Sequence, residues 1–186
     1  MIEVEIKLPI LRRSTVEHGL ASLGFIPKDL VKEHDMYFTC DTRNFMERDE
    51  ALRIRQTENM TERKDSCVIT FKGPKLDGVS MTRKELETTV GDKKTMTAIL
   101  EALGYHAMYP VNKLRQYYEL DNIHACVDQV EGLGSFLELE ILVPTEEEKD
   151  NALSRIEEIL DHLGYTMAET TRRSYLYMLQ KKAGLL

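Results

Sequence analysis

The sequence predicts an α+β fold: a closed eight-stranded antiparallel β-barrel with a charged interior and with helices packed outside. Three observations lead to this prediction. Segments in which polar and apolar residues alternate recur along most of the 186 residues, turn residues separate these segments, and three amphipathic segments interrupt them. Because amphipathic helices need an apolar surface, we expect them to cover the apolar faces of the strands from outside. The charged faces then line the interior.

The expected strands are the segments with period-2 alternation. They span residues 2–8, 34–39, 51–57, 66–72, 80–89, 112–120, 123–130, 135–143 and 172–178. Asp121 and Asn122 form a dipeptide typical of a tight hairpin, and residues 75–78 and 131–135 fit longer hairpin loops. This makes eight or nine strands, and most of their pairing is expected to be antiparallel.

Three helices are expected between the strands. They span residues 14–23, 92–103 and 145–163. Each stops at a glycine, a residue that readily adopts the left-handed conformation of a helix end: Gly24, Gly104 and Gly164. No Pro-rich or Ser-rich linker divides the chain, so residues 1–180 are expected to form a single domain, followed by a short tail of residues 181–186.

The charge balance excludes some classes of partner. The chain has 25 Lys and Arg against 32 Asp and Glu, a net charge of −7, whereas nucleic-acid-binding domains usually carry a basic excess. No apolar run approaches the roughly 18 residues of a membrane span, and the N-terminal strand is charged at alternate positions, unlike a signal peptide. The three cysteines lack a paired spacing. These features predict a cytoplasmic protein that binds neither nucleic acid nor membrane.

Long charged side chains occupy one face of nearly every expected strand, because residues two apart in a strand share a face. The set comprises seven acids and seven bases: Glu3, Glu5, Glu85, Glu87, Asp128, Glu138, Glu140, Lys7, Arg53, Arg55, Lys72, Arg83, Lys113 and Arg115. A solvated sheet face explains the alternation on any one strand. Solvent exposure explains the complete set of charged residues less well, because Thr, Ser, Gln and Asn would suit a solvent-exposed face equally.

A charged interior requires partners for its charges, since an unpaired charge removed from water is costly. Carboxylates hold Mg²⁺ or Mn²⁺ through oxygen, while Arg and Lys neutralise phosphate, so the two together suit a metal–triphosphate complex. The expected metal ligands are Glu3, Glu5, Asp128, Glu138 and Glu140. The expected phosphate-binding residues are Lys7, Arg53, Arg55, Lys72, Arg83, Lys113 and Arg115.

Eight ordered motifs resemble the CYTH superfamily, which joins class IV adenylyl cyclases with thiamine triphosphatases and inorganic triphosphatases. They are Glu3-x-Glu5-x-Lys7, HDMYF, ALRIR, TFKGP, TRKELE, NKLR, VDQVEGLGSFLELE and a closing RSYLYML, and they extend from residue 2 to about residue 178. The order of DMYF, ALRIR, FKGP and RSYL looks most like the class IV cyclase-like proteins.

The resemblance implies an eight-stranded antiparallel tunnel that binds a triphosphate together with Mg²⁺ or Mn²⁺. It implies that Glu85 and Glu87 hold basic side chains in orientation, and that Lys72 with Tyr37 acts as the base. Ordinary strand packing explains Tyr37 equally well. The implied ligand is ATP, inorganic triphosphate or thiamine triphosphate, and the resemblance leaves room for a homodimer.

Three functions are compatible with this site. The resemblance places first a class IV adenylyl cyclase-like enzyme, which converts ATP to cyclic AMP and pyrophosphate. The alternative is a triphosphatase that hydrolyses inorganic triphosphate, thiamine triphosphate or a nucleoside triphosphate. The third is a non-catalytic sensor that binds triphosphate or polyphosphate without turnover. The two Glu-x-Glu pairs among the expected metal ligands, Glu3/Glu5 and Glu138/Glu140, are both complete, which favours a bound metal and therefore chemistry over sensing.

Overall fold

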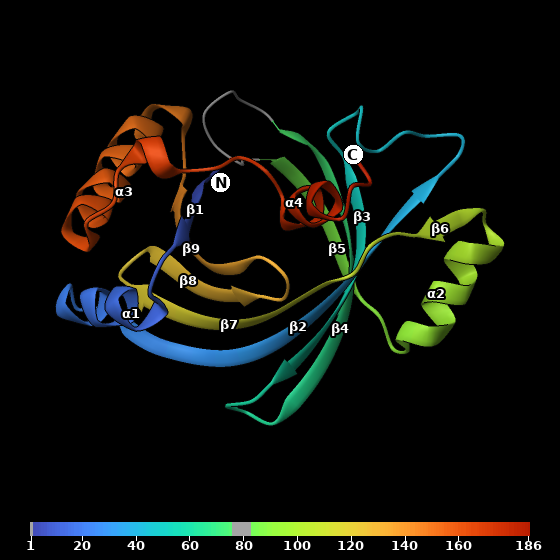
Figure 1. The fold of residues 1–186 in the computed structure, drawn as a ribbon, viewed down its shortest axis with the longest axis horizontal. Helices are drawn as coiled ribbons and strands as arrows, with labels where there is room; N and C mark the ends of the chain where they lie inside the picture. The colour runs from blue at the N-terminus through green and yellow to red at the C-terminus, as the bar shows by residue number, and fades with distance from the viewer. Residues whose placement is uncertain (1, 76–82) are drawn as a thin grey trace.

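The computed structural model of this chain describes residues 2–75 and 83–186. Its nine strands form one curled sheet (Figure 1). The strands are β1 (Ile2–Ile10), β2 (Ile26–Cys40), β3 (Ala51–Asn59), β4 (Lys64–Lys75), β5 (Arg83–Thr89), β6 (Tyr105–Ala107), β7 (Val111–Leu120), β8 (Ile123–Val130) and β9 (Gly134–Val143). The helices are α1 (Arg13–Ser22), α2 (Lys93–Ala102), α3 (Lys149–Leu163) and α4 (Tyr175–Lys182), with 3-10 turns η1 (Glu146–Glu148) and η2 (Met167–Glu169).

The strand order is β1-β9-β8-β7-β2-β3-β4-β5, with β6 beside β2, and each of these pairings is antiparallel. The path ends at β1 and β5, and no pairing joins these two strands within residues 2–75 and 83–186. The expected closed barrel is therefore not confirmed; the sheet is a curled half-barrel. The edge strand β5 reads RKELETT, and charged residues on an edge strand disfavour further pairing.

The expected strand at residues 172–178 is wrong. Its second half begins helix α4, and Ser174 caps this helix by accepting a hydrogen bond from Tyr177 N at 3.1 Å. The ninth strand is instead β6, which the sequence did not predict. Strand β2 also starts at Ile26 rather than at residue 34. The loop expected at 75–78 and the start of the strand expected at 80–89 lie mostly outside the described residues.

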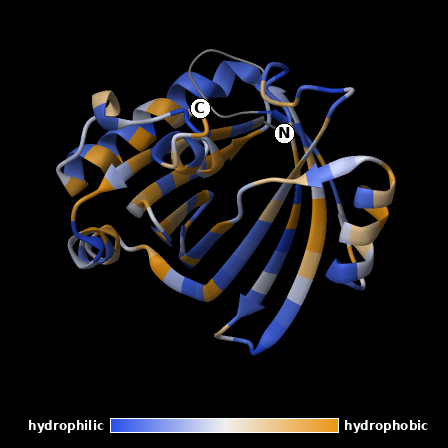
Figure 2. Ribbon diagram, turned by 45° about the vertical axis from the view of Figure 1, so that its right-hand side comes forward, coloured by the Kyte–Doolittle hydropathy of each residue, from blue (hydrophilic) through white to orange (hydrophobic). Residues whose placement is uncertain are grey.

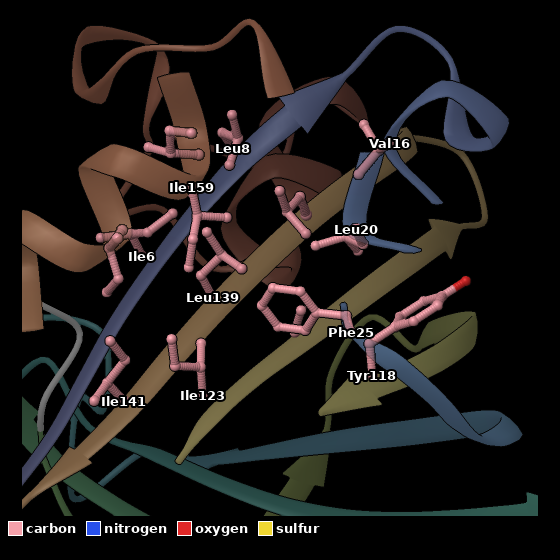
Figure 3. Close-up of a cluster of buried hydrophobic side chains, with 14 of the residues drawn as sticks. Ile6, Leu8, Val16, Leu20, Phe25, Tyr118, Ile123, Leu139, Ile141 and Ile159 are labelled. Carbon is pink, nitrogen blue, oxygen red and sulfur yellow. The ribbon is translucent and has the colours of Figure 1, made fainter. Parts of the chain in front are cut away.

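Helices α1 and α3 cover the convex face of β1, β8 and β9, as expected for helices packed outside (Figure 3). The strands contribute side chains such as Leu139, and the helices contribute Leu20 and Ile159. Helix α2 covers the other flank, where Leu100 packs with Phe38 and Ile54. Figure 2 shows the underlying pattern, in which hydrophilic and hydrophobic bands alternate along the strands. The predicted helix stops are confirmed; at Gly164, for example, φ is +78°.

Helix α4 lies inside the curve of the sheet (Figure 1). Its residues Tyr175 and Leu179 pack against Val111, Val130 and Phe136 of β7, β8 and β9. The helix crosses the boundary expected at residue 180, while the division into residues 1–180 and a tail of 181–186 stays a prediction. In the described part of the chain, no helix is long and apolar enough to span a membrane.

Candidate functional site

A cavity of about 890 Å³ opens on the concave face of the sheet, beside α4. All seven bases expected to bind phosphate line it. The lining also includes Tyr37, Glu85 and four of the five acids expected to hold metal: Glu3, Glu5, Glu138 and Glu140. Asp128 and Glu87 do not line it. The alternation of the strands therefore directs both signs of charge into one cavity.

Asp128 lies beneath the cavity and is completely buried. It accepts hydrogen bonds from Arg115 at 2.7 and 2.6 Å, from Lys113 at 3.1 Å and from the Tyr175 hydroxyl at 2.9 Å. Both of its oxygens are engaged by donors from this chain. In this geometry Asp128 holds two bases and α4, which differs from the metal-ligand role predicted for it.

Two further buried acids, Glu33 and Asp35, belong to the site although the sequence pattern did not predict them. Asp35 accepts two hydrogen bonds from Arg55, each 2.7 Å long. Glu33 Oε2 lies 3.0 Å from Arg55 Nη1 and 3.1 Å from Lys113 Nζ. Burial alone would raise the pKa of Glu33, but Lys113 and Arg55 outweigh it and hold this pKa well below its usual value. The signal was present, because Glu33, Asp35 and Tyr37 alternate along one face of β2.

These contacts define a buried charge network in the middle of the sheet. Its members are Glu33, Asp35, Arg55, Lys113, Arg115 and Asp128. Acids and bases are equal in number, and their close contacts satisfy the requirement that buried charges be paired. Three of the seven expected phosphate-binding residues are thus already compensated by acids of this chain.

Within the described residues, Arg53 of β3 and Lys72 of β4 have fewer acidic partners than Arg55. Arg53 donates to Thr70 at 3.3 Å and lies 3.8 Å from Asp35, yet its buried Nε has no hydrogen-bond partner among residues 2–75 and 83–186. Lys72 donates to Glu85 at 2.5 Å. Thr70 in turn donates to Glu87 at 2.7 Å, so Glu87 reaches Arg53 through a hydroxyl. Glu85 and Glu87 therefore contact the basic side chains directly or through one residue.

Arg83 lies on β5, where it joins the sheet to the segment before β3. Its Nη1 donates to the carbonyl oxygens of Asp49 and Gly73, each at 3.2 Å. Asp49 also accepts from Lys75 Nζ at 2.5 Å. These contacts hold the segment of residues 41–50 against β4 and β5, where it lines the cavity.

A row of acids faces the cavity from β1 and β9. Glu5 lies opposite Glu140 in the register, and Lys7 lies opposite Glu138, with 3.5 Å between Lys7 Nζ and Glu138 Oε1. Burial, and next the charge of Glu138, raises the pKa of Glu5 to about 7. Burial also raises the pKa of Glu3 and Glu140, with Glu140 and Glu5 respectively as the next cause. Like charges placed opposite each other in this way are destabilising without a cation.

These carboxylates fit a divalent metal in their chemistry. Mg²⁺ and Mn²⁺ take oxygen ligands, and a cation would relieve the repulsion within the acidic row. The described residues do not gather three or more His, Cys, Asp or Glu side chains closely enough to hold a metal ion. The donors are therefore suitable, but a complete ligand set is not assembled in this conformation.

The predicted base, Lys72 with Tyr37, also lies on the cavity. Burial, and next the charge of Arg53, lowers the pKa of Lys72, which increases the share of its neutral, proton-accepting form at a given pH. Burial, and next the charge of Asp35, raises the pKa of Tyr37, which also packs against the cluster that includes Val111. The electrostatics therefore favour Lys72 over Tyr37 as the proton acceptor.

The sequence pattern of the CYTH domain matches residues 1–175. The chain belongs to the CYTH family. This family binds triphosphate substrates, and CYTH enzymes generally depend on divalent metal. A Methanocaldococcus jannaschii protein that carries the provisional name of an adenylate cyclase is 41% identical over 176 residues, which cover 95% of this CYTH chain and 97% of that protein.

Solved structures share the CYTH fold seen here. A Pyrococcus horikoshii OT3 protein superposes with a TM-score of 0.86 at 33% identity, over 97% of this chain and 99% of its own. A Hippeastrum protein, provisionally named an adenylyl cyclase and described as having a dominant triphosphatase activity, superposes with a TM-score of 0.65 at 16% identity, over 98% and 95%. At 16% identity, the similarity to the Hippeastrum protein concerns the fold alone.

Proposed function

We propose that this CYTH protein is a metal-dependent enzyme of the class IV adenylyl cyclase type, which converts ATP to cyclic AMP and pyrophosphate. The observation that carries the proposal is the cavity, in which the bases of β3, β4 and β5 and the acids of β1 and β9 line one space. In a metal–triphosphate complex, the negative phosphates complement the bases and the positive metal ion complements the acids. The name of the M. jannaschii relative supports the cyclase reaction.

The proposed metal ligands are the acids of the row on β1 and β9, chiefly Glu3, Glu5 and Glu140. These carboxylates would hold Mg²⁺ or Mn²⁺, which would supply positive charge to neutralise part of the phosphate charge. Glu138 contributes indirectly, because it pairs with Lys7 and Arg115. Asp128 contributes in the same indirect way, through Arg115 and Lys113.

The proposed phosphate contacts are led by Arg53, whose Nε is buried without a partner in the described structure. A phosphate oxygen would supply the missing acceptor, with Arg83 adding positive charge from β5. In the cyclase reaction the ribose 3′-hydroxyl attacks the α-phosphorus in line, and pyrophosphate leaves. Lys72 is the proposed acceptor of the hydroxyl proton, because it lines the cavity and its lowered pKa makes the neutral amine easier to form.

The apolar part of the cavity favours ATP over inorganic triphosphate. Phe45, Met46, Met108, Leu176 and Tyr177 all line it. Inorganic triphosphate has no apolar group to bury there, whereas an adenine ring does. The volume of about 890 Å³ also lies toward the upper end of the roughly 300–1,000 Å³ typical of small-molecule sites.

The test is incubation of the protein with ATP, thiamine triphosphate or inorganic triphosphate in Mg²⁺ or Mn²⁺, with cyclic AMP and phosphate measured separately. We expect cyclic AMP from ATP, and none above background from Glu5→Ala. Release of phosphate without cyclic AMP, from ATP, thiamine triphosphate or inorganic triphosphate, would assign the protein to the triphosphatases. Tight, metal-independent binding of polyphosphate without turnover would identify a sensor.

A further inference from the structure

Strand β2 places two acids between two basic strands in the centre of the sheet. Glu33 lies opposite Lys113 of β7 in the register, and Asp35 lies opposite Arg55 of β3. Each acid therefore meets a base on a different neighbouring strand. This arrangement joins three strands of the sheet by charge beneath the cavity.

The contacts between these residues leave little freedom to Arg55. Its Nε and Nη2 donate to Asp35 at 2.7 Å each, and its Nη1 lies 3.0 Å from Glu33 Oε2. Every guanidinium nitrogen thus lies within 3.0 Å of a carboxylate oxygen. Glu33 is held in turn by the hydroxyl of Tyr117, which donates to its Oε1 at 3.2 Å. The planar, charge-assisted fork between Arg55 and Asp35 orients the guanidinium far better than a single point charge does. The contact of Nη1 with Glu33 Oε2 is an ion pair without hydrogen-bond geometry, since this oxygen has no hydrogen-bond partner in the described part of the chain.

Glu33 lies behind the cavity rather than on it. Arg55, Lys113 and Asp35 belong to the lining, whereas Glu33 does not and is only 2% exposed. A substrate in the cavity can touch Arg55 and Lys113 but not Glu33. Any influence of Glu33 on the reaction must therefore pass through the bases that it contacts.

Glu33 stabilises the charged form of the base beside it, Lys113. Burial disfavours the charged form of Lys113, and so does the neighbouring Arg115, yet the nearby Asp128 and Glu33 outweigh both and raise the pKa of Lys113. Long side chains held in place before the substrate arrives lose less conformational entropy on binding. Donors fixed in this way also stabilise developing charge without reorganisation.

We propose that Glu33 is a positioning residue, which with Asp35 holds Lys113 and Arg55 in the geometry that the triphosphate requires. This inference rests on the proposed function, because it concerns the same site. If Glu33 only balanced the charge of its neighbours, its replacement by a neutral residue would strengthen the binding of triphosphate instead of weakening it. Removing one negative charge would then make the cavity more positive and strengthen the binding of an anion.

The test compares Glu33→Gln and Glu33→Asp in the full chain. We expect Glu33→Gln to lower kcat for ATP by about tenfold or more, the scale of effect that follows from misplaced catalytic groups. We expect it to weaken the binding of inorganic triphosphate by about threefold, measured by calorimetry, in spite of the added positive charge. Glu33→Asp keeps the charge and should recover part of kcat. The matched control is Glu58→Gln, on the opposite face of neighbouring β3, where the carboxylate lies near His34.

An unchanged kcat in Glu33→Gln, or tighter triphosphate binding, would overturn the proposal. If Glu33→Gln does not fold, Glu33→Asp replaces it, because this change keeps the charge and moves only the carboxylate; a lowered kcat supports the proposal and an unchanged kcat contradicts it. If the unmodified protein turns over no triphosphate, the proposed function fails. The positioning role is then decided by the direction of the change in triphosphate affinity alone.

Discussion

Arg115 and Asp128 form a two-pronged ion pair beneath the cavity, with 2.7 Å between Nε and Oδ1 and 2.6 Å between Nη2 and Oδ2. Asp128 is completely buried, and it also accepts from Lys113 and Tyr175. The pair joins β7 to β8, and the tyrosine adds α4 to the same carboxylate. One acid therefore connects the basic side of the site to the helix inside the curve of the sheet.

We expect Asp128→Asn to lower the free energy of unfolding by about 3–5 kcal/mol, because it leaves buried cations without their counterion. Urea denaturation followed by circular dichroism measures this change. The control is Glu119→Gln, which breaks an exposed pair with Lys28 and should cost about 1 kcal/mol or less. An Asp128→Asn protein of normal stability that had lost Mg²⁺ binding would restore the metal-ligand role predicted from the sequence.

We expect Arg53→Gln to weaken the binding of inorganic triphosphate about tenfold or more, since a charge-assisted hydrogen bond to phosphate is lost. Asp35 keeps its main partner, Arg55, so the fold should survive. Calorimetry in Mg²⁺ measures the affinity, and a thermal melt checks folding. Arg48→Gln, at an exposed position, serves as the control. Equal affinity in the two variants would exclude Arg53 as the leading phosphate ligand.

The raised pKa of Glu5, about 7 against a usual 4.5, predicts a pH-dependent stability. The folded protein holds this proton more tightly than the unfolded chain, so the stability that the proton provides is present below about pH 4.5 and is lost as the pH rises through about 7. Without divalent metal, the melting temperature of the unmodified protein should therefore fall relative to that of Glu5→Gln over this range. The comparison isolates Glu5 from acids whose pKa is lowered, such as Glu33 and Glu138.

Added Mg²⁺ should reverse this trend. A metal ion binds the ionised carboxylate, so the stabilisation by Mg²⁺ should grow as the pH rises toward 7 and should be smaller in Glu5→Gln. Melting curves at several pH values, with and without Mg²⁺, measure both effects. Parallel curves for the two proteins would show that Glu5 neither holds the extra proton nor binds metal.

We expect Met46→Ala to raise the KM for ATP several-fold and to leave the affinity for inorganic triphosphate unchanged. The methionine lines the apolar part of the cavity, and the loss of about 1 kcal/mol of apolar contact affects only a ligand with a ring to bury. Met60→Ala is a close control, because both side chains belong to residues that are 49% exposed and Met60 lies off the cavity. A similar loss for both ligands would place Met46 beside the phosphates instead.

Much of the candidate site could be predicted because side-chain direction in a strand is a local property. Alternation alone placed Arg53, Lys72 and Lys113 on one face, and all three line the cavity. Glu33 was missed because the predicted strand began at residue 34, which left it outside the strand. Asp35 lay inside the predicted strand, on the same face as Tyr37, but was not assigned to the charged set. Asp128 was placed on the correct face, but the sequence could not show that its oxygens would be taken by Arg115, Lys113 and Tyr175.

The sequence by itself established the antiparallel strands, the helix stops and the face on which the charges lie, since each depends on residues close together in the chain. It could not predict the secondary structure of residues 172–178. The tyrosines of this segment alternate as in a strand, yet residues from 175 onward form a helix that packs on Val130 and Phe136. The open edge between β1 and β5 and the pairing of each acid with its base likewise arose only on folding. These features join residues far apart in the sequence, where burial and charge compensation outweigh local preference.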